Sequence, residues 1–308
     1  REFRKNWISC PARIVYSEAF VQNNRKMKNG MKRDTKMTDH VKIEAEEEIS
    51  KTKAVENKPK AEQSIIYIIG MGPGSQEMMT QQAKDALEIS DVIVGYTVYV
   101  DLLRAYYPEK EFVTTPMRQE IERCRICFAL AGEGKRVSMV CSGDAGVYGM
   151  AAPMYELQQE NEAYRQTELV VIPGITAANS GAAVLGAPLN HDYCVISLSD
   201  LLTPWEQIEK RLIAAIQGDF AIAVYNPSSH KRKDHLKRAC DIMLTAGASP
   251  DRACGYVENI GREGTKAHVL TLGQLRETPV NMFTIVFIGN SKSVIMGDKL
   301  VTGRGYQI

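Results

Sequence analysis

The residues best placed for chemistry follow short apolar runs, and many of them are glycines. The run 65–69, I-I-Y-I-I, leads into Gly70, Gly72, Pro73 and Gly74. Glycine carries no Cβ, so its backbone can approach a ligand closely and adopt positive φ angles. In α/β proteins, a strand that ends in such a turn builds a small-molecule site at its carboxyl end. The turn therefore predicts a ligand-binding loop that contains Gly72, Pro73 and Gly74.

Three further loops share this design. S-G-D-A-G-V-Y-G spans 142–149 after the run 136–141, and P-G-I-T-A-A spans 173–178 after the run 168–172. Y-N-P, at 225–227, ends another strand-like run. Each loop alone is more often a turn than a site. Four such strand ends in succession are typical of one crevice beside a sheet, so we expect them to converge on one ligand.

A dinucleotide is the first alternative ligand, because G-x-G turns also bind nucleotides. That fingerprint needs G-x-G-x-x-G opening into a helix and an acidic residue about twenty positions later. Here Pro73 interrupts the loop and Ser75 stands where a glycine would be needed. Asp91 has the right spacing but begins the next apolar run, where it cannot reach a ribose. The pattern therefore disfavours a dinucleotide.

The cysteines and histidines do not predict a metal site. Cys124 and Cys127 form a lone C-x-x-C within a helical pattern, whereas zinc needs four ligands. His230 and His235 are five residues apart, which does not place them on one helical face. Seven scattered cysteines indicate a reducing compartment, so we expect a cytoplasmic protein without a bound metal.

Composition separates a charged tail from a globular remainder. The chain has 308 residues, of which 44% are apolar and 24% charged, and no apolar run approaches the roughly 20 residues that span a membrane. Residues 1–64 carry 15 Lys/Arg and 10 Asp/Glu, a net of +5, and the remainder carries 23 and 27, a net of −4. We expect 1–64 to be a disordered tail and Met37 to be the biological start. Bulk charge gives the globular part no nucleic-acid-binding surface.

Strand-like runs and helical patterns alternate from residue 65 onward. This alternation predicts α/β layers with a largely parallel sheet, at least in the first half. The interruption at 186–192 suggests domains at 65–188 and 189–308. We expect Thr176 to cap the helix after it, and Thr203 to begin the helix at 204. The expected strands are 65–69, 92–95, 136–141, 168–172, 194–198, 219–225, 253–258 and 283–288, and the expected helices are 77–90, 117–133, 148–159, 176–185, 204–216 and 231–246.

In this order and spacing, G-M-G-P-G, S-G-D-A-G-V-Y-G and P-G-I-T-A-A resemble the tetrapyrrole methylases, which use S-adenosyl-L-methionine. The resemblance runs from about Ile65 to Tyr306. Later segments resemble the branch that methylates C-17 of precorrin-3B or cobalt-factor III in cobalamin biosynthesis and contracts the macrocycle. These segments are H-D-Y-C-V-I-S-L-S-D-L-L-T-P-W (191–205), A-V-Y-N-P-S-S (223–229), I-G-R (260–262), N-M-F-T-I-V-F-I-G-N-S (281–291) and G-R-G-Y (303–306).

The resemblance implies two unlike α/β domains with the methyl donor in the cleft between them, usually in a homodimer. It implies donor contacts from Pro73, Ser142, Gly143, Asp144, Val147, Thr176, Ala177, Asn226 and Gly261. Gly72, Gly74 and Tyr225 join this set because they belong to the same strand-end loops.

Methyl transfer from a sulfonium needs alignment of a carbon nucleophile with the C–S bond, and no metal or activated serine. Ring contraction also needs a general base. The candidates are Asp144, His191, Asp192 and Asp200. Each has a structural alternative: Asp144 could cap loop amides, His191 and Asp192 could form a linker turn, and Asp200 could cap a helix.

The substrate carries many carboxylates, so cations should meet it. The candidates for substrate contact are Arg118, Tyr148, Lys231, Arg232, Arg262 and Arg304.

Two rival functions stay open. Another precorrin or uroporphyrinogen-III methyltransferase would share the donor loops but not 191–205 and 281–306. A non-enzymatic protein that senses the donor would use the basic tail to bind nucleic acid.

Overall fold

The computed structural model describes residues 64–229 and 231–307. Its first sheet has five parallel strands in the order β3-β2-β4-β1-β5. Ile66, Ile68 and Val94 are fully buried, as expected for β-branched residues in a parallel sheet that is covered on both faces. The strands are β1 (Ile65–Gly70), β2 (Val92–Tyr96), β3 (Glu111–Thr115), β4 (Val137–Cys141) and β5 (Glu168–Ile172).

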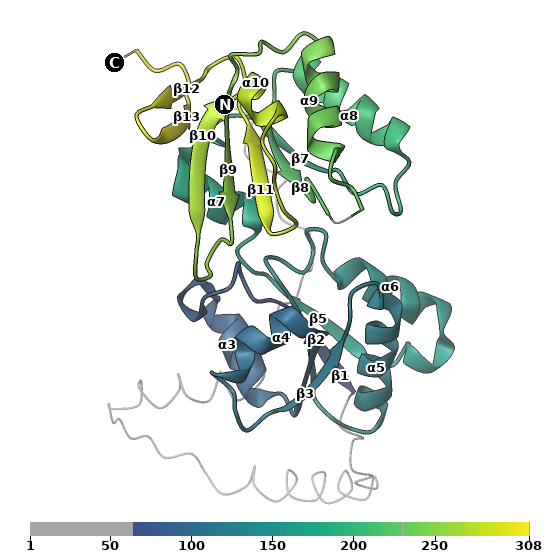
Figure 1. Ribbon diagram of the computed structural model, residues 1–308. Helices are drawn as coiled ribbons and strands as arrows, with labels where there is room; N and C mark the ends of the chain where they lie inside the picture. The colour runs from purple at the N-terminus through teal and green to yellow at the C-terminus, as the bar shows by residue number, and fades with distance from the viewer. Residues whose placement is uncertain (1–63, 230, 308) are drawn as a thin grey trace, which may run out of the picture. The chain divides into compact units, whose positions relative to one another are not determined.

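Helices cover both faces of the first sheet. One apolar cluster joins α3 (Gln81–Ile89) and α4 (Thr97–Arg104) to one face, through side chains such as Leu87. Another joins α5 (Glu120–Gly132) and α6 (Ala151–Glu160) to the other face. Short 3₁₀ turns lie at η1 (Gln76–Met78) and η2 (Glu162–Tyr164). All the strand ends that lead into loops at the carboxyl edge therefore lie between two helical layers (Figure 1).

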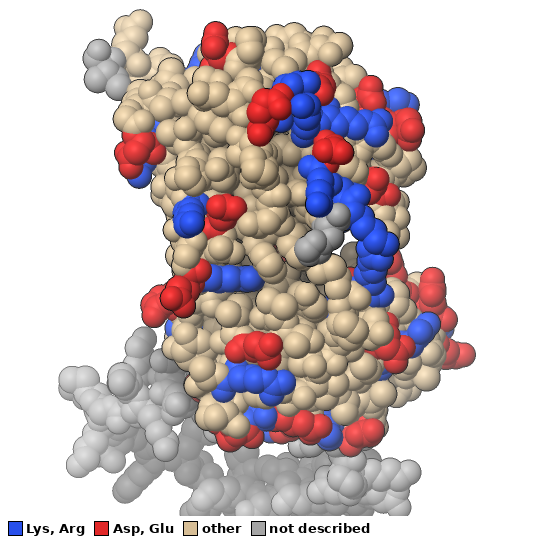
Figure 2. Space-filling view, viewed as in Figure 1, with Lys and Arg blue, Asp and Glu red and all other residues tan. Residues whose placement is uncertain are grey.

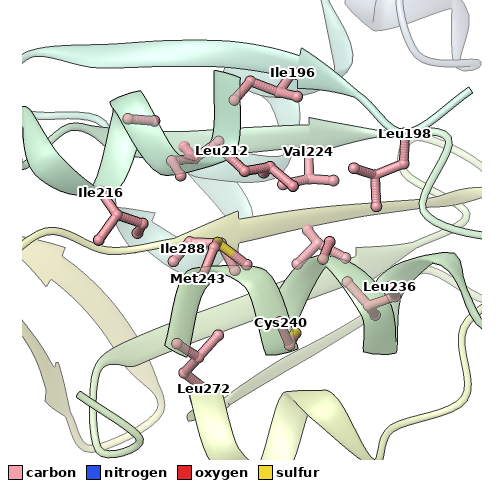
Figure 3. Packing of buried hydrophobic residues seen from close by; sticks show 14 of the residues in the cluster. Ile196, Leu198, Leu212, Ile216, Val224, Leu236, Cys240, Met243, Leu272 and Ile288 are labelled. Carbon is pink, nitrogen blue, oxygen red and sulfur yellow. The ribbon is translucent and has the colours of Figure 1, made fainter. Parts of the chain in front are cut away.

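The second sheet is mixed, in the order β10-β9-β11-β8-β7. β7 and β8 pair in parallel, and the remaining pairs are antiparallel. One face packs against α8 (Trp205–Gln217), α9 (His235–Thr245) and α10 (Leu272–Arg276), and Figure 3 shows Leu212, Met243 and Ile288 interleaved in this core. The strands are β7 (Tyr193–Ser197), β8 (Ala221–Tyr225), β9 (Ala253–Glu258), β10 (Lys266–Thr271) and β11 (Thr284–Ile288).

The other face of the second sheet packs against α7 (Ala177–Leu185). A Cβ at Gly181 would meet the ring of Phe287 at 2.9 Å, so this small-residue helix lies close against β11. A small third sheet joins β6 (Gly186–Ala187), β12 (Ser293–Met296) and β13 (Lys299–Thr302). We keep the division at 188/189 as a proposal, although α7 precedes it and packs on the second sheet.

The α/β fold expected from the sequence is confirmed. All eight expected strands are present. The elements that were not expected are β3, β6, β10, β12, β13, α4 and α10. The prediction that Thr203 caps α8 is wrong: Pro204 occupies the N-cap position and no side chain caps the helix.

The tail at 1–63, Met37 and His230 lie outside the described residues. Within the described part of the chain, no helix has the length and apolarity that crossing a membrane requires.

Candidate functional site

A pocket of about 200 Å³ lies where the loops of the two sheets meet. Loops after β1, β4 and β5, together with Tyr99 on α4, supply one wall. The other wall comes from the carboxyl ends of β8 and β9 and from the start of β11, which is antiparallel to β9 and so begins where β9 ends. The lining residues are Pro73, Tyr99, Ser142, Gly143, Asp144, Val147, Tyr148, Thr176, Ala177, Tyr225, Asn226, Asn259, Ile260, Arg262, Met282, Phe283, Thr284 and Ile285.

Direct main-chain contacts between glycines hold the loops of the first sheet together. Gly72 and Gly143 exchange two hydrogen bonds, with the Gly72 amide donating over 3.0 Å and the Gly143 amide donating over 2.7 Å. A Cβ at Gly174 would lie 2.1 Å from the Gly143 carbonyl oxygen and 2.5 Å from that of Gly70. These loops therefore touch only because the residues at the contacts are glycines.

Gly72, Gly74 and Gly261 were expected to contact the donor, but they lie behind the pocket lining. Their missing side chains make room for protein atoms. A Cβ at Gly72 would meet the Met78 carbonyl oxygen at 2.6 Å, and one at Gly74 would meet Cγ of Arg262 at 2.7 Å. These three glycines support the pocket wall, and in this structure they do not form it.

Asp144 uses both carboxylate oxygens to hold the loops. Oδ1 accepts the Gly146 amide at 2.8 Å, and Oδ2 accepts the Gly174 amide at 2.9 Å. The carboxylate therefore ties the loop after β4 to the loop after β5 while lining the pocket. This is the structural alternative that the sequence left open: the two amides fix the carboxylate between the loops.

Tyr225 crosses from β8 to the start of α7. Its hydroxyl accepts the Ala178 amide at 2.9 Å and lies 2.5 Å from Oγ1 of Thr176. Thr176 does occupy the N-cap position of α7, but its side chain makes no cap hydrogen bond, so Tyr225 supplies that acceptor. Burial raises the pKa of Tyr225, which keeps the hydroxyl protonated.

Strained backbone gathers at the pocket. Outside glycine, positive φ angles occur at five described residues, and three of them line the pocket: Tyr148, Asn226 and Asn259. Asparagine tolerates this conformation, whereas tyrosine adopts it at a cost. Tyr148 donates a hydrogen bond to the Val195 carbonyl over 3.3 Å, and its ring lies 5.2 Å from that of Tyr225. Both contacts hold Tyr148 between the two sheets.

Arg262 forms a cationic part of the wall. Its guanidinium lies 5.8 Å from the ring centroid of Tyr99 and 5.3 Å from that of Phe283. Burial lowers the pKa of Arg262, and no carboxylate within the described ranges pairs with it. An anionic group of a ligand could therefore fill that place.

Several predicted residues lie away from the pocket. His191 and Asp192 precede β7, whereas the pocket lies after it, and the Asp192 carbonyl accepts the Ala221 amide at the amino end of β8. Arg118 follows the edge strand β3, whose loop does not reach the lining. Arg304 follows β13, where its guanidinium lies over Tyr306. The geometry therefore does not bring these four residues to the site.

Asp200 and Arg232 lie at the correct edge of the second sheet, in a polar cluster next to the lining. Asp200 follows β7, and its Oδ1 lies 3.6 Å from Nη1 of Arg232. Nε2 of His235 lies 3.5 Å from Asp200, a contact that was not predicted from the sequence.

Residues that the sequence analysis did not single out also line the pocket. Asn259 adjoins the I-G-R segment, and Met282, Phe283, Thr284 and Ile285 belong to the segment 281–291, so the resemblance already marked their neighbourhood. Tyr99 carried no such signal, because α4 was not expected.

Neither the cysteines nor other side chains assemble a metal site in the portion that the structure describes. The six cysteines described there are unpaired. Burial raises the pKa of Cys124 to about 12 and that of Cys141 to about 11. Cys124 and Cys127 therefore lie on the buried face of α5 and pack as part of the core.

Comparison with known proteins gives a consistent result. The model of a family described as Tetrapyrrole (Corrin/Porphyrin) Methylases matches residues 65–276. A probable cobalt-factor III C(17)-methyltransferase from Salmonella typhimurium is 43% identical over 79% of this chain and 100% of its own length. A precorrin-3B C(17)-methyltransferase from Sinorhizobium sp is 37% identical over 75% of this chain and 91% of its own length.

Solved structures share the fold. The methyltransferase CobJ superposes with a TM-score of 0.72 at 35% identity, covering 77% of this chain and 99% of its own. A uroporphyrin-III C-methyl transferase from Thermus thermophilus, complexed with S-adenosyl homocysteine, superposes with a TM-score of 0.58 at 19% identity, over 73% of this chain and 96% of its own. The second likeness concerns the fold alone.

Proposed function

We propose a specific reaction for this chain on an established premise: the chain belongs to the tetrapyrrole (corrin/porphyrin) methylases. We infer that it is an S-adenosyl-L-methionine-dependent methyltransferase that acts on C-17 of precorrin-3B or cobalt-factor III. The reaction includes ring contraction and belongs to cobalamin biosynthesis. The names of its relatives support this assignment, because both substrates occur among them.

One observation carries the donor assignment. Nine of the twelve residues expected at the donor line a single pocket, although they come from loops up to 153 positions apart, from Pro73 to Asn226. They are Pro73, Ser142, Gly143, Asp144, Val147, Thr176, Ala177, Tyr225 and Asn226. Loops that close around a small molecule at the strand ends are the usual ligand site of such folds.

The pocket suits reaction by positioning. The donor already activates its methyl group, so the protein must hold the nucleophilic carbon in line with the C–S bond. Alignment of this kind can supply about 7–11 kcal/mol of the barrier reduction. Tyr148 and Arg262, which line the same pocket, are proposed to contact the macrocycle beside the donor.

We propose Asp200 as the general base for ring contraction. Asp144 is engaged by two backbone amides, and His191 and Asp192 lie at the opposite end of β7. Asp200 lies at the pocket edge of the second sheet, 3.6 Å from Nη1 of Arg232 and 3.5 Å from Nε2 of His235, and it accepts no hydrogen bond from the residues that the structure describes. Its carboxylate is therefore the one among the four candidates best able to turn toward a macrocycle.

Incubation with methyl-labelled donor tests the reaction. Precorrin-3B, cobalt-factor III and uroporphyrinogen III would each be supplied, and methyl incorporation followed by mass spectrometry. We expect one of the first two to gain a methyl group. Methylation of uroporphyrinogen III alone would assign the chain to another branch of the family, and failure to bind S-adenosylhomocysteine would refute the proposal.

We also propose a cytoplasmic homodimer. The unpaired thiols support a reducing compartment. Val294, Ile295 and Met296 on β12 are exposed apolar side chains of the kind that subunit interfaces cover. Light scattering of the purified protein would give twice the monomer mass if the dimer forms.

A further inference from the structure

A polar cluster outside the pocket lining holds Arg232 in a fixed position. Nη1 of Arg232 donates to Oγ of Ser199 over 2.7 Å, and Nε donates to Oγ of Ser229 over 3.0 Å. The side chain is 25% exposed. Two neutral hydroxyl groups therefore orient the guanidinium without neutralising its charge.

The counter-ion of Arg232 is loosely held. Asp200 lies 3.6 Å from Nη1 of Arg232 and 3.5 Å from Nε2 of His235, and both distances exceed those of hydrogen bonds. Nδ1 of His235 lies 3.0 Å from the Leu198 carbonyl oxygen, which can only accept, so Nδ1 carries the proton. Asp200 is thus a partner that another carboxylate could replace.

The cluster is continuous with the donor pocket. Oγ of Ser197 accepts Nδ2 of Asn226 at 2.9 Å and the amide of Ser199 at 3.2 Å. Asn226 lines the pocket, and Ser199 binds Arg232. A ligand that extends out of the pocket past Asn226 would therefore reach Arg232.

The same loop also presents apolar side chains to solvent. Leu201 is 64% exposed and Leu202 is 93% exposed, next to Asp200. Lys231 and Lys233 flank Arg232 and are exposed, and Figure 2 shows Lys and Arg side chains gathered on the face near the start of α9. An apolar surface beside concentrated positive charge fits a ligand with an apolar ring and anionic substituents.

We infer that Arg232, oriented by Ser199 and Ser229, binds a carboxylate side chain of the macrocycle. This inference rests on the proposed function and deepens it. The substrate carboxylate takes the place of Asp200 on Arg232, and Leu201 and Leu202 contact the ring. Substrate binding thereby releases Asp200 from its ion pair, so that its carboxylate becomes free only when the macrocycle is present.

If a substrate carboxylate replaces Asp200 on Arg232, substitutions of Arg232 and of Asp200 should change the affinity for a tetrapyrrole in opposite directions. Arg232→Met removes the site and should raise the dissociation constant of uroporphyrin III, a stable tetrapyrrole with a carboxylate on every side chain, by about 10-fold to 100-fold. Asp200→Asn removes the internal competitor and should lower the same constant. If Arg232 served only to hold the loop through Asp200, both variants would weaken binding alike.

Fluorescence titration of the full chain with uroporphyrin III, in the presence of S-adenosylhomocysteine, measures these constants. Arg125→Met is the matched control, because Arg125 forms a surface ion pair of 3.5 Å with Glu122 on α5. It should leave the constant unchanged. Leu202→Ser should weaken binding about 3-fold to 10-fold, as loss of a contacting apolar side chain requires, while Ile89→Ser, at another exposed apolar residue, should not.

Titration of each variant with S-adenosylhomocysteine alone separates this inference from the proposed function. We expect Arg232→Met to bind it as the unaltered chain does, which also shows that the variant is folded. Equal porphyrin affinity for Arg232→Met and the unaltered chain, weaker binding by Asp200→Asn, or no porphyrin binding by the unaltered chain would each overturn the inference. Failure to bind S-adenosylhomocysteine would instead overturn the proposed function.

Discussion

The hydroxyl group of Tyr225 connects the second sheet to the start of α7, which follows the loop after β5. It meets the Thr176 hydroxyl and accepts the Ala178 amide, one of the amides at the start of α7 that no helical carbonyl can satisfy. A tyrosine thus performs the capping that Thr176 was expected to perform. The chain position of a cap residue could be predicted, but the direction of its side chain depended on a neighbour 49 residues away.

Tyr225→Phe should therefore lower the free energy of unfolding by about 1–3 kcal/mol, because it leaves a buried amide without an acceptor. It should also weaken binding of S-adenosylhomocysteine, since Thr176 and Ala177 line the pocket. Urea unfolding and calorimetric titration measure the two effects. Tyr155→Phe, at an exposed tyrosine of α6, should change neither.

Asp144→Ala should weaken donor binding more than it disturbs the fold. The change removes the acceptor of the Gly146 and Gly174 amides, so the loops after β4 and β5 lose their link. We expect the dissociation constant of S-adenosylhomocysteine to rise at least about 10-fold, corresponding to about 1.4 kcal/mol. An unchanged constant in isothermal titration would remove Asp144 from the pocket.

At the scale of elements, the loops depend on close contact between backbones. Gly72→Val should abolish donor binding. The structure gives a different physical reason for this loss than the sequence did. The sequence analysis placed Gly72 against the ligand, whereas its Cβ would strike the Met78 carbonyl oxygen at 2.6 Å. A positive φ of 72° adds strain for a β-branched residue.

Gly132→Val provides the control for that substitution, because a Cβ there meets nothing within 4 Å. Equilibrium dialysis with labelled S-adenosylhomocysteine should show loss of binding for the first variant and retention for the second. A Gly72→Val protein with full affinity would contradict the close packing of the loops.

The amino ends of β2 and β4 are joined by an ion pair. Asp91 accepts both the amide and the guanidinium of Arg136, and these hydrogen bonds lower its pKa to about 2. A carboxylate with a lowered folded pKa stabilises the fold above its ordinary pKa, and this contribution disappears as the pH falls toward 2. Solvent exposure of both side chains limits the contribution to less than about 1 kcal/mol.

Asp91→Asn should therefore destabilise the protein slightly at pH 7, and the difference should shrink below pH 4 and vanish as the pH falls through 2. Unfolding curves of both proteins across this range would show the difference shrinking between pH 4 and pH 2. A difference that stayed constant with pH would mean that the charge of Asp91 contributes nothing. Asp91 thus lies at the amino end of β2, whereas the pocket lies beyond the carboxyl ends of the strands.

At the scale of the whole molecule, the strand ends could be predicted better than the pocket walls. Central strands such as β4, V-S-M-V-C, are buried along their whole length and mostly apolar, whereas the edge strands β3 and β10 carry charged and polar residues and were missed. α4, T-V-Y-V-D-L-L-R, is rich in β-branched residues, so local propensity did not reveal a helix. Tyr99 and Phe283 reach the pocket through tertiary packing that no local pattern encodes.

A ligand held by both sheets should stabilise both. With S-adenosylhomocysteine at 100 times its dissociation constant, linkage adds about 2.7 kcal/mol and slows globally controlled amide exchange about 100-fold. We expect this slowing for the slowest amides of β4 and of β11 alike. Hydrogen exchange followed by mass spectrometry would detect it, and protection confined to one sheet would show that the pocket is not shared.

The thiol of Cys141 directly precedes the loop that begins with Ser142, so the most nucleophilic type of side chain lies one residue from the pocket lining. A thiolate beside a sulfonium would take the methyl group and inactivate the enzyme by self-alkylation. Burial in the core keeps this sulfur protonated and turned inward. Such placement would spare a bound sulfonium from reaction with the protein before a substrate arrives.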